Sequence, residues 1–354
     1  MTKPINLVQK GYLMRATFSR LFFVQLLLSS ATALAVPAPT AEDIITSLAL
    51  KQDQVANLHR GEIVALEIGE ATQKELAMGL GIYLRSPPAK LAAYFKSGKL
   101  GWIDPDITAH GEMQPKSGVD AFNGFAITFK QGDEAKTLLD AAAGGRFNLS
   151  AEEIQGLAAL KKNLTNADKI ALVEGVSQHY REILLHRWQA YRQDGLAGIA
   201  PYARDGADAS PAEELRTAAA SSKVLARYFP DLHKAWLNYP AKLASGAEEQ
   251  FYWLNRKVEN RPTAILGHRI LQTSDAGSVI LARQFFVGHS YNSSQLTIVC
   301  LPYHDGSIVF YAHRTSTDQV AGMGSGLKHA VGREQMREQM IKNLERLRSA
   351  IQSF

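Results

Sequence analysis

Two arginines and a histidine interrupt apolar segments near the end of the chain. Arg283 and Arg314 each alternate in step with apolar residues two positions away, and His313 directly precedes Arg314. A charge on an apolar face is costly unless it is paired. We therefore predict that these three residues face a cavity and anchor the anionic head group of a ligand. The alternative interpretation places the arginines on the outer face or at strand ends, with Asp318 available to neutralise Arg314.

A histidine and a serine are adjacent in the segment 288–294. His289 beside Ser290 would set a base next to a nucleophile, as serine hydrolases do. The G-x-S-x-G spacing of a nucleophile elbow is not met, because Asn292 stands where the second glycine belongs. We therefore prefer a polar loop at the sheet edge and predict no catalytic residue. A secreted hydrolase using His289 with Ser290 is kept as an alternative.

One face of a predicted helix over residues 167–193 carries His179, Glu182 and His186. Imidazoles and a carboxylate at this spacing could bind Zn²⁺. The apolar residues of the helix lie on its other side, so we interpret this face as a solvated surface. We predict no metal site and no cofactor.

The glycine-rich segment 322–326 precedes the last predicted helix. Its spacing does not match the phosphate-binding loop G-x-x-x-x-G-K-[ST]. A flexible connection is the preferred interpretation, and a lid over a cavity is the alternative.

Hydrophobic periodicity predicts the elements that would position these residues. After Pro262, apolar and polar residues alternate over four segments joined by short turns, which indicates an antiparallel meander. In the helix that follows, Met336 and Met340 begin an apolar stripe, so this helix must pack on an apolar surface. The predicted strands are 263–273, 278–287, 295–303 and 307–315, and the helix is 327–352.

The rest of the chain is predicted to mix strands and helices at first and then to become helical. Strands are expected at 61–68, 76–84 and 121–130, and helices at 41–58, 87–96, 151–162, 167–193, 211–228 and 247–258.

This order of elements resembles the helix-grip fold of the START/SRPBCC superfamily. The resemblance is carried by Gly81–Phe95, a strand running into a short helix, and by Thr263–Gln352, the meander and final helix. It implies a curved antiparallel sheet that wraps a long C-terminal helix and leaves a cavity between them. The chain is also similar to a group of exported bacterial proteins with no assigned activity. The competing interpretation is two separate domains, an N-terminal α/β unit and a C-terminal α+β unit.

We therefore predict an α+β fold, in which a curved antiparallel sheet packs on a long C-terminal helix and is interrupted by a large helical insertion. The predicted organisation is a signal peptide (1–35), an N-terminal helix (36–60), the first part of the α+β domain (61–134), the helical insertion (135–261), and the meander and C-terminal helix that complete the domain (262–354).

The start of the chain predicts export. Arg15 and Arg20 precede the short apolar run 21–28, and the small residues Ala33 and Ala35 stand at −3 and −1 of a cleavage site. We expect cleavage after Ala35 and a periplasmic or secreted protein of 319 residues without a transmembrane segment. The leader carries four basic residues and no acid, so the net charge of +5 falls to +1. A near-neutral chain without a basic tract argues against nucleic acid as a partner.

Together these patterns predict an exported, non-enzymatic protein that binds a hydrophobic or amphipathic small molecule. Pockets for such ligands are mostly apolar and carry a few polar anchors. The predicted ligand-binding residues are Arg283, His313, Arg314, Met336 and Met340. One alternative is a structural or interaction protein whose helical block docks a partner, and the other is the secreted hydrolase.

Overall fold

The computed structural model describes residues 38–97, 104–125, 127, 132–144 and 146–354. The predicted leader, residues 1–35, and its cleavage site lie outside the described residues. No helix in the described part of the chain is both long and apolar enough to cross a bilayer.

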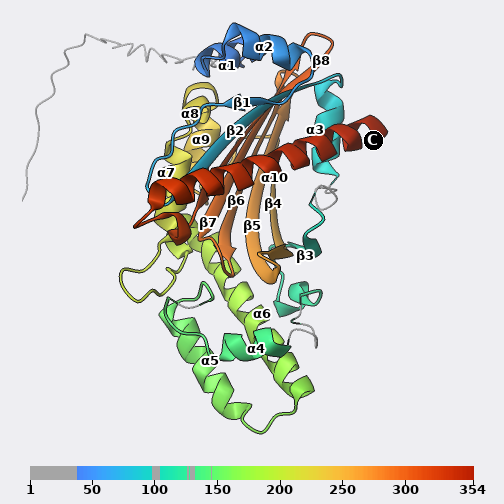
Figure 1. Cartoon of the computed structure of the whole chain (residues 1–354). Helices are drawn as coiled ribbons and strands as arrows, with labels where there is room; N and C mark the ends of the chain where they lie inside the picture. Colours follow the sequence, from blue (N-terminus) through green and yellow to red (C-terminus); the bar gives the residue numbers. More distant parts are fainter. Residues whose placement is uncertain (1–37, 98–103, 126, 128–131, 145) are drawn as a thin grey trace, which may run out of the picture. The chain divides into compact units, whose positions relative to one another are not determined.

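Eight antiparallel strands in the described residues form one sheet in the order β1-β2-β8-β7-β6-β5-β4-β3 (Figure 1). Strands β4 to β8 form a meander because short turns join them, such as His304–Asp305 between β7 and β8. β2 pairs with β8 over its whole length and so brings the first part of the chain into the same sheet. The strands are β1 (Val64–Leu66), β2 (Glu75–Leu84), β3 (Ile107–Met113), β4 (Ala247–Val258), β5 (Arg261–Ser274), β6 (Gly277–Val287), β7 (Ser293–Tyr303) and β8 (Gly306–Ser316).

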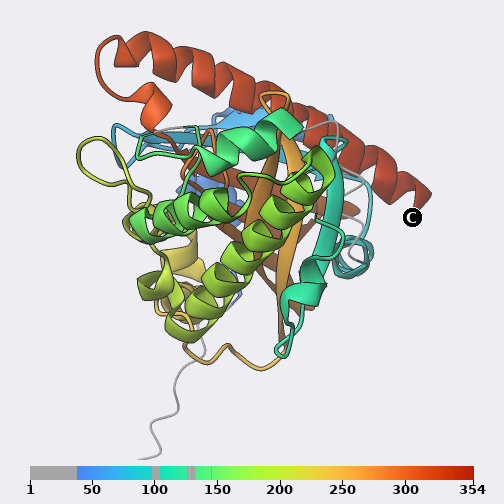
Figure 2. The ribbon, with the colours of Figure 1, turned by 90° about the horizontal axis from the view of Figure 1, so that it is seen from below.

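The C-terminal helix α10 (Ser325–Ser353) crosses one face of the sheet (Figures 1 and 2). Its buried residues, from Met340 to Ile351, join one apolar cluster with side chains of β2, β6, β7 and β8. Helix α3 (Pro88–Lys96) adds Leu91 and Phe95 to the same cluster. The predicted stripe therefore does pack on the sheet.

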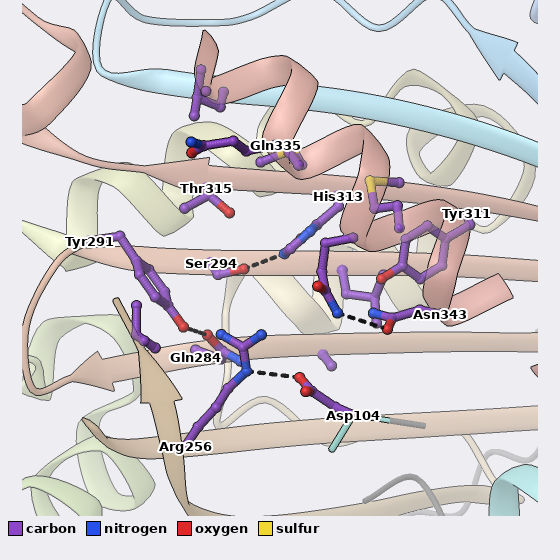
Figure 3. Close-up of a pocket in the computed structure, with 18 of the residues that line it drawn as sticks. Asp104, Arg256, Gln284, Tyr291, Ser294, Tyr311, His313, Thr315, Gln335 and Asn343 are labelled. Atoms are coloured by element: carbon purple, nitrogen blue, oxygen red, sulfur yellow. Dashed lines mark hydrogen bonds and ion pairs between the residues drawn. The ribbon is translucent and has the colours of Figure 1, made fainter. Parts of the chain in front are cut away.

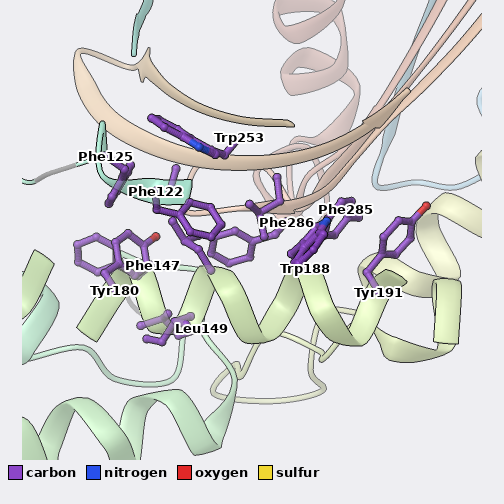
Figure 4. Packing of buried hydrophobic residues seen from close by; sticks show 14 of the residues in the cluster. Phe122, Phe125, Phe147, Leu149, Tyr180, Trp188, Tyr191, Trp253, Phe285 and Phe286 are labelled. Atoms are coloured by element: carbon purple, nitrogen blue, oxygen red, sulfur yellow. The ribbon is translucent and has the colours of Figure 1, made fainter. Parts of the chain in front are cut away.

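Helices also cover the opposite face of the sheet. Helix α6 (Lys169–Asp194) sets Tyr191 against Phe285 of β6, with the two rings stacked and their centroids 4.0 Å apart (Figure 4). Because helices cover both faces of the sheet, every residue of β6 except Gln284 is buried. The other helices whose buried residues join this side are α1 (Ala41–Ser47), α2 (Gln52–His59), α4 (Gly132–Leu139), α5 (Ala151–Asn163), α7 (Pro211–Ala220), α8 (Lys223–Tyr228) and α9 (Pro230–Leu237).

The predicted α+β fold is confirmed. A curved antiparallel sheet packs on a long C-terminal helix, and helices α4 to α9 lie in the chain between β3 and β4, which is a helix-grip-like layout. The predictions for β2, α3, α5, α6, α10 and the four strands β5 to β8 agree with the structure within a few residues.

One predicted helix is wrong, because residues 247–258 form strand β4. Phe251, Trp253 and Asn255 are buried in alternation, and β4 pairs with β5 along its whole length and with β3 along part of it. Pairing with β5, which follows directly in the chain, and with the distant β3 outweighs the local helical preference. The predicted helical insertion, 135–261, therefore includes a strand of the main sheet.

Other boundaries also differ. In the predicted strand 121–130, the described residues begin with the end of a 3-10 helix (Val119–Phe122), and residues 126 and 128–131 lie outside the description. The predicted helix 41–58 breaks into α1 and α2 near Ala49, whose φ of 50° is left-handed and ends a helical run. The predicted helix 211–228 is divided between α7 and α8.

Candidate functional site

A cavity of about 810 Å³ lies between the sheet and α10 (Figure 3). A cavity in this place was predicted from the resemblance to the helix-grip fold. Residues of β4, β6, β7 and β8 line it from the sheet side, and α10 lines it from the other side. Much of the wall is apolar. These apolar residues include Phe95, Leu254, Leu296, Ile298, Val309, Met340, Leu344 and Leu347.

The cavity exists because α10 is held to the rest of the fold near both ends. Near its start, His329 Nδ1 lies 3.0 Å from Glu70 Oε2 and Nε2 lies 2.9 Å from the Gln73 carbonyl oxygen. Near its end, the buried residues of 344–351 pack on the sheet. The 29 residues of α10 span about 43 Å. A helix of this length bridges the curved sheet, and its residues from Leu327 to Leu347 line the cavity beneath it.

A row of neutral polar side chains crosses the sheet face of the cavity. Gln284 of β6 pairs in register with Ser294 of β7, which pairs in turn with Thr315 of β8. The Tyr291 hydroxyl donates a hydrogen bond to Gln284 Oε1 at 2.6 Å. His313 Nε2 and Ser294 Oγ are 2.6 Å apart (Figure 3). These groups give an otherwise apolar cavity several hydrogen-bonding positions.

An ion pair forms the charged part of the wall. Arg256 Nε donates to Asp104 Oδ2 at 2.7 Å, and their side chains are only 20% and 17% exposed. Burial works to lower the pKa of Arg256, but the neighbouring Tyr291 and the Asp104 carboxylate outweigh it and raise that pKa. Arg256 therefore stays charged, and Asp104 compensates that charge.

Burial also keeps two other titratable groups of the wall neutral. It lowers the pKa of His313 to about 4, and the nearby Arg256 charge acts in the same direction. It raises the pKa of Tyr311 to about 12, partly offset by a hydrogen bond with Asn343. At neutral pH the imidazole and the phenol are therefore both uncharged.

Three of the five predicted ligand-binding residues line the cavity. They are His313, Met336 and Met340. Met340 is buried in the stripe of α10, and Met336 is partly buried beside it. Whether these residues contact a ligand stays a prediction.

The structure does not bring Arg283 or Arg314 to this cavity. Arg283 is fully buried on the opposite face, where its Nη2 donates to the Trp236 carbonyl oxygen at 2.6 Å. Arg314 pairs there with Glu75, with Nη1 and Oε2 2.8 Å apart, and does not use Asp318. Because the sheet is covered on both faces, sharing a face with apolar residues did not show which face an arginine occupies.

Most of the polar wall was not predicted from the sequence. Arg256 lies in the segment predicted as a helix, and Asp104 precedes β3, a strand that was not predicted. Gln284 had a detectable signal, because it alternates in step with Ala282 and interrupts an apolar face just as Arg283 does. However, Gln284 and Arg283 are adjacent and so lie on opposite faces of the strand. The same pattern therefore marked both faces and did not show which one meets the cavity.

Ser290 and His289 are in hydrogen-bond contact, but the direction of the hydrogen bonds does not activate the serine. Ser290 Oγ donates its proton to Glu259 Oε2 at 2.8 Å, and His289 Nδ1 lies 2.6 Å from the same Oγ. The other ring nitrogen lies 2.6 Å from Thr263 Oγ1. Burial lowers the pKa of His289 to about 4. The histidine is therefore a weak base whose two nitrogens are both engaged, and neither His289 nor Ser290 lines the cavity.

Among the described residues, no group of three His, Cys, Asp or Glu side chains is placed to hold a metal ion. His179 Nδ1 lies 3.6 Å from Glu182 Oε2, and His186 is exposed on the helix surface. Cys300 is buried, and burial raises the pKa of its thiol to about 12, so it is not a reactive thiolate.

Comparison with known proteins adds little to this description. No protein-family model and no curated protein sequence matches the chain. Among solved structures the chain is similar to "Crystal structure of the di-domain ARO/CYC StfQ from the steffimycin biosynthetic pathway", at 12% identity over 77% of this chain and 97% of that one. The TM-score of 0.23 is too low to transfer an activity. The helix-grip-like assignment therefore rests on the strand order and the position of α10.

Proposed function

We propose that this protein binds a hydrophobic or amphipathic small molecule in the cavity between the sheet and α10. The main observation that supports this proposal is the cavity itself. Its volume of about 810 Å³ falls within the range of about 300–1,000 Å³ that is usual for small-molecule sites. Its wall combines apolar side chains with a few polar groups, which is the composition that such ligands require.

The chemistry of the wall supports binding without catalysis. A general acid or base works best when its pKa lies near the operating pH. His313, with a pKa lowered to about 4 by burial, is a poor base at neutral pH and already bonds Ser294. The Arg256 and Asp104 side chains bond each other. These pairings leave the described wall suited to orienting a ligand.

Native mass spectrometry of the purified protein, followed by solvent extraction, tests this proposal. We expect a discrete added mass that extracts as an apolar or amphipathic compound. The Ala282→Phe variant is designed to fill the cavity, because Ala282 is a small residue in its wall. Lys342→Phe, at an exposed position of α10 outside the cavity, is the matched control.

The expected result is that Ala282→Phe loses the bound mass and the binding of an uncharged cavity dye, whereas Lys342→Phe keeps both. Circular dichroism and thermal unfolding establish that each variant is folded. A wild-type protein that carries no bound mass and binds no dye would overturn the proposal, as would unchanged dye binding by folded Ala282→Phe.

We also propose that the chain is exported after cleavage behind Ala35, and that it is related to the START/SRPBCC superfamily. The basic residues, the short apolar run and the small residues of 1–35 support export. The sheet wrapped on α10 supports the relationship. Mass analysis of the protein from its native host should give a chain that begins at Val36 in an exported fraction. A chain with an intact leader in the cytoplasm would contradict export.

A further inference from the structure

We infer that the cavity selects an uncharged ligand bearing hydroxyl or carbonyl groups, and that Asp104 sets this preference by compensating Arg256. This inference rests on the proposed function and adds the ligand class. The expected ligand is therefore neutral and does not carry the anionic head group that was predicted from Arg283 and Arg314, because these arginines lie on the other face of the sheet.

The charges in the buried part of the described wall cancel. Its only charged side chains are Asp104, Arg256 and Lys328. The first two bond each other at 2.7 Å. Lys328 is exposed, and its Nζ donates to the Ala321 carbonyl oxygen at 3.1 Å. The buried part of the described wall therefore holds one cation and one anion and has no net charge.

Asp104 is held in place without help from a ligand. Its Oδ1 accepts a hydrogen bond from the Asp106 backbone N–H at 3.0 Å, while Oδ2 accepts from Arg256. Figure 3 shows the terminal nitrogens of Arg256 turned away from the Asp104 carboxylate. These N–H groups can donate to a neutral oxygen of the ligand while the ion pair stays intact.

An anionic ligand would meet an electrostatic penalty here. A ligand carboxylate beside Arg256 would place two negative charges around one positive charge in a buried site. Like charges at close range disfavour the charged form, and removing an ion from water is costly when its partner is already taken. A hydroxyl or carbonyl group avoids both costs.

The remaining polar groups suit such a ligand. Ser294, Gln284 and Tyr291 are neutral and can donate or accept hydrogen bonds. His313 is neutral as well, because burial lowers its pKa to about 4. Apolar walls near these groups, including Ile298, would receive the hydrocarbon part of the ligand.

Displacement of N-phenylnaphthylamine, an uncharged fluorescent dye, tests the inference. Dodecanol, dodecanoate and dodecylamine serve as competitors at about pH 8, where the acid and the amine are both charged. For the wild-type protein we expect dodecanol to bind at least about tenfold more tightly than either charged competitor.

Two reciprocal variants address the ion pair. Asp104→Asn leaves Arg256 uncompensated, so dodecanoate should bind about tenfold more tightly than to the wild type. Arg256→Gln leaves Asp104 uncompensated, so dodecylamine should gain by a similar factor. Glu338→Gln, which makes the same charge change as Asp104→Asn at an exposed position of α10, should alter no preference. If one of these two variants does not fold, the other is sufficient to test the role of the ion pair.

The outcomes separate the inference from the proposed function. A wild-type protein that does not bind the dye overturns the proposed function and this inference with it. Dye binding with a wild-type preference for dodecanoate or dodecylamine overturns the inference alone. Unchanged preferences in folded Asp104→Asn or folded Arg256→Gln overturn it as well, because the ion pair would then not set the selectivity.

Discussion

The guanidinium carbon of Arg283 lies 3.5 Å from the centre of the Trp236 ring, beneath the helices that cover the sheet. Arg283 is fully buried, and its Nε and Nη1 atoms have no hydrogen-bond partner among the described residues. Burial lowers the pKa of this arginine. A buried cation held mainly by an aromatic face and one backbone carbonyl oxygen is an energetic liability, and this one does not line the cavity.

The two buried arginines should respond differently to replacement by methionine, which keeps much of the side-chain length. Arg283→Met should change the free energy of unfolding by no more than about 1 kcal/mol, because no buried carboxylate loses its partner. Arg314→Met should destabilise by about 3 kcal/mol or more, since it strands Glu75, which is only 2% exposed. Urea unfolding measures both values.

Neither variant should alter dye binding, because both side chains lie away from the cavity. Equal stability losses in the two variants would contradict the contrast between a paired and an unpaired cation. Loss of dye binding in folded Arg283→Met would contradict the assignment of the binding site to the α10 face.

Stability should fall as the pH drops below about 6.5. Burial lowers the pKa values of His268, His289 and His313 to about 4, and at His268 it outweighs the Glu249 carboxylate. In the unfolded chain a histidine titrates near about 6.5. Between these values the unfolded state binds protons that the folded state does not, so the free energy of unfolding decreases as the pH falls. Above about 6.5 both states are neutral at these sites, and this dependence vanishes.

Urea unfolding at several pH values between about 4.5 and 7.5 measures this slope. His313→Gln should flatten it, because one buried histidine no longer contributes. His186→Gln, on the exposed surface of α6, serves as the control and should leave the slope unchanged. An identical slope in His313→Gln and the wild type would mean that His313 is protonated in the folded state as well.

His329 should hold the first part of α10 against the loop before β2. His329→Ala removes the bonds to Glu70 and to the Gln73 carbonyl oxygen, which are worth about 1–2 kcal/mol together. We expect faster amide hydrogen exchange over residues 327–339 and unchanged exchange over 344–353, where the apolar stripe packs. Faster exchange along the whole of α10 would contradict the idea that the two ends of the helix are attached independently of each other.

The sequence by itself determined most of the sheet and the helix that covers it. Alternation over 263–315 predicted four strands, and the stripe from Met336 to Ile351 predicted a helix packed on them. Both are local signals, because the period of apolar residues reports the backbone conformation directly. The cavity between these elements was expected because their order resembles the helix-grip fold, in which the sheet and the final helix enclose a cavity.

Only the tertiary structure decided which side chains face the cavity. A strand period of two divides side chains into two sets but does not say which set meets α10 when helices bury both faces, so Arg283 and Gln284 could not be assigned from alternation. The pair of Asp104 and Arg256 joins residues 152 positions apart in the sequence. β4, which carries Arg256, becomes a strand through pairing with β3 and β5. The contact of Asp104 with Arg256 and the pairing of β4 with β3 join segments that lie far apart in the chain, and a single sequence carries no local signal for them.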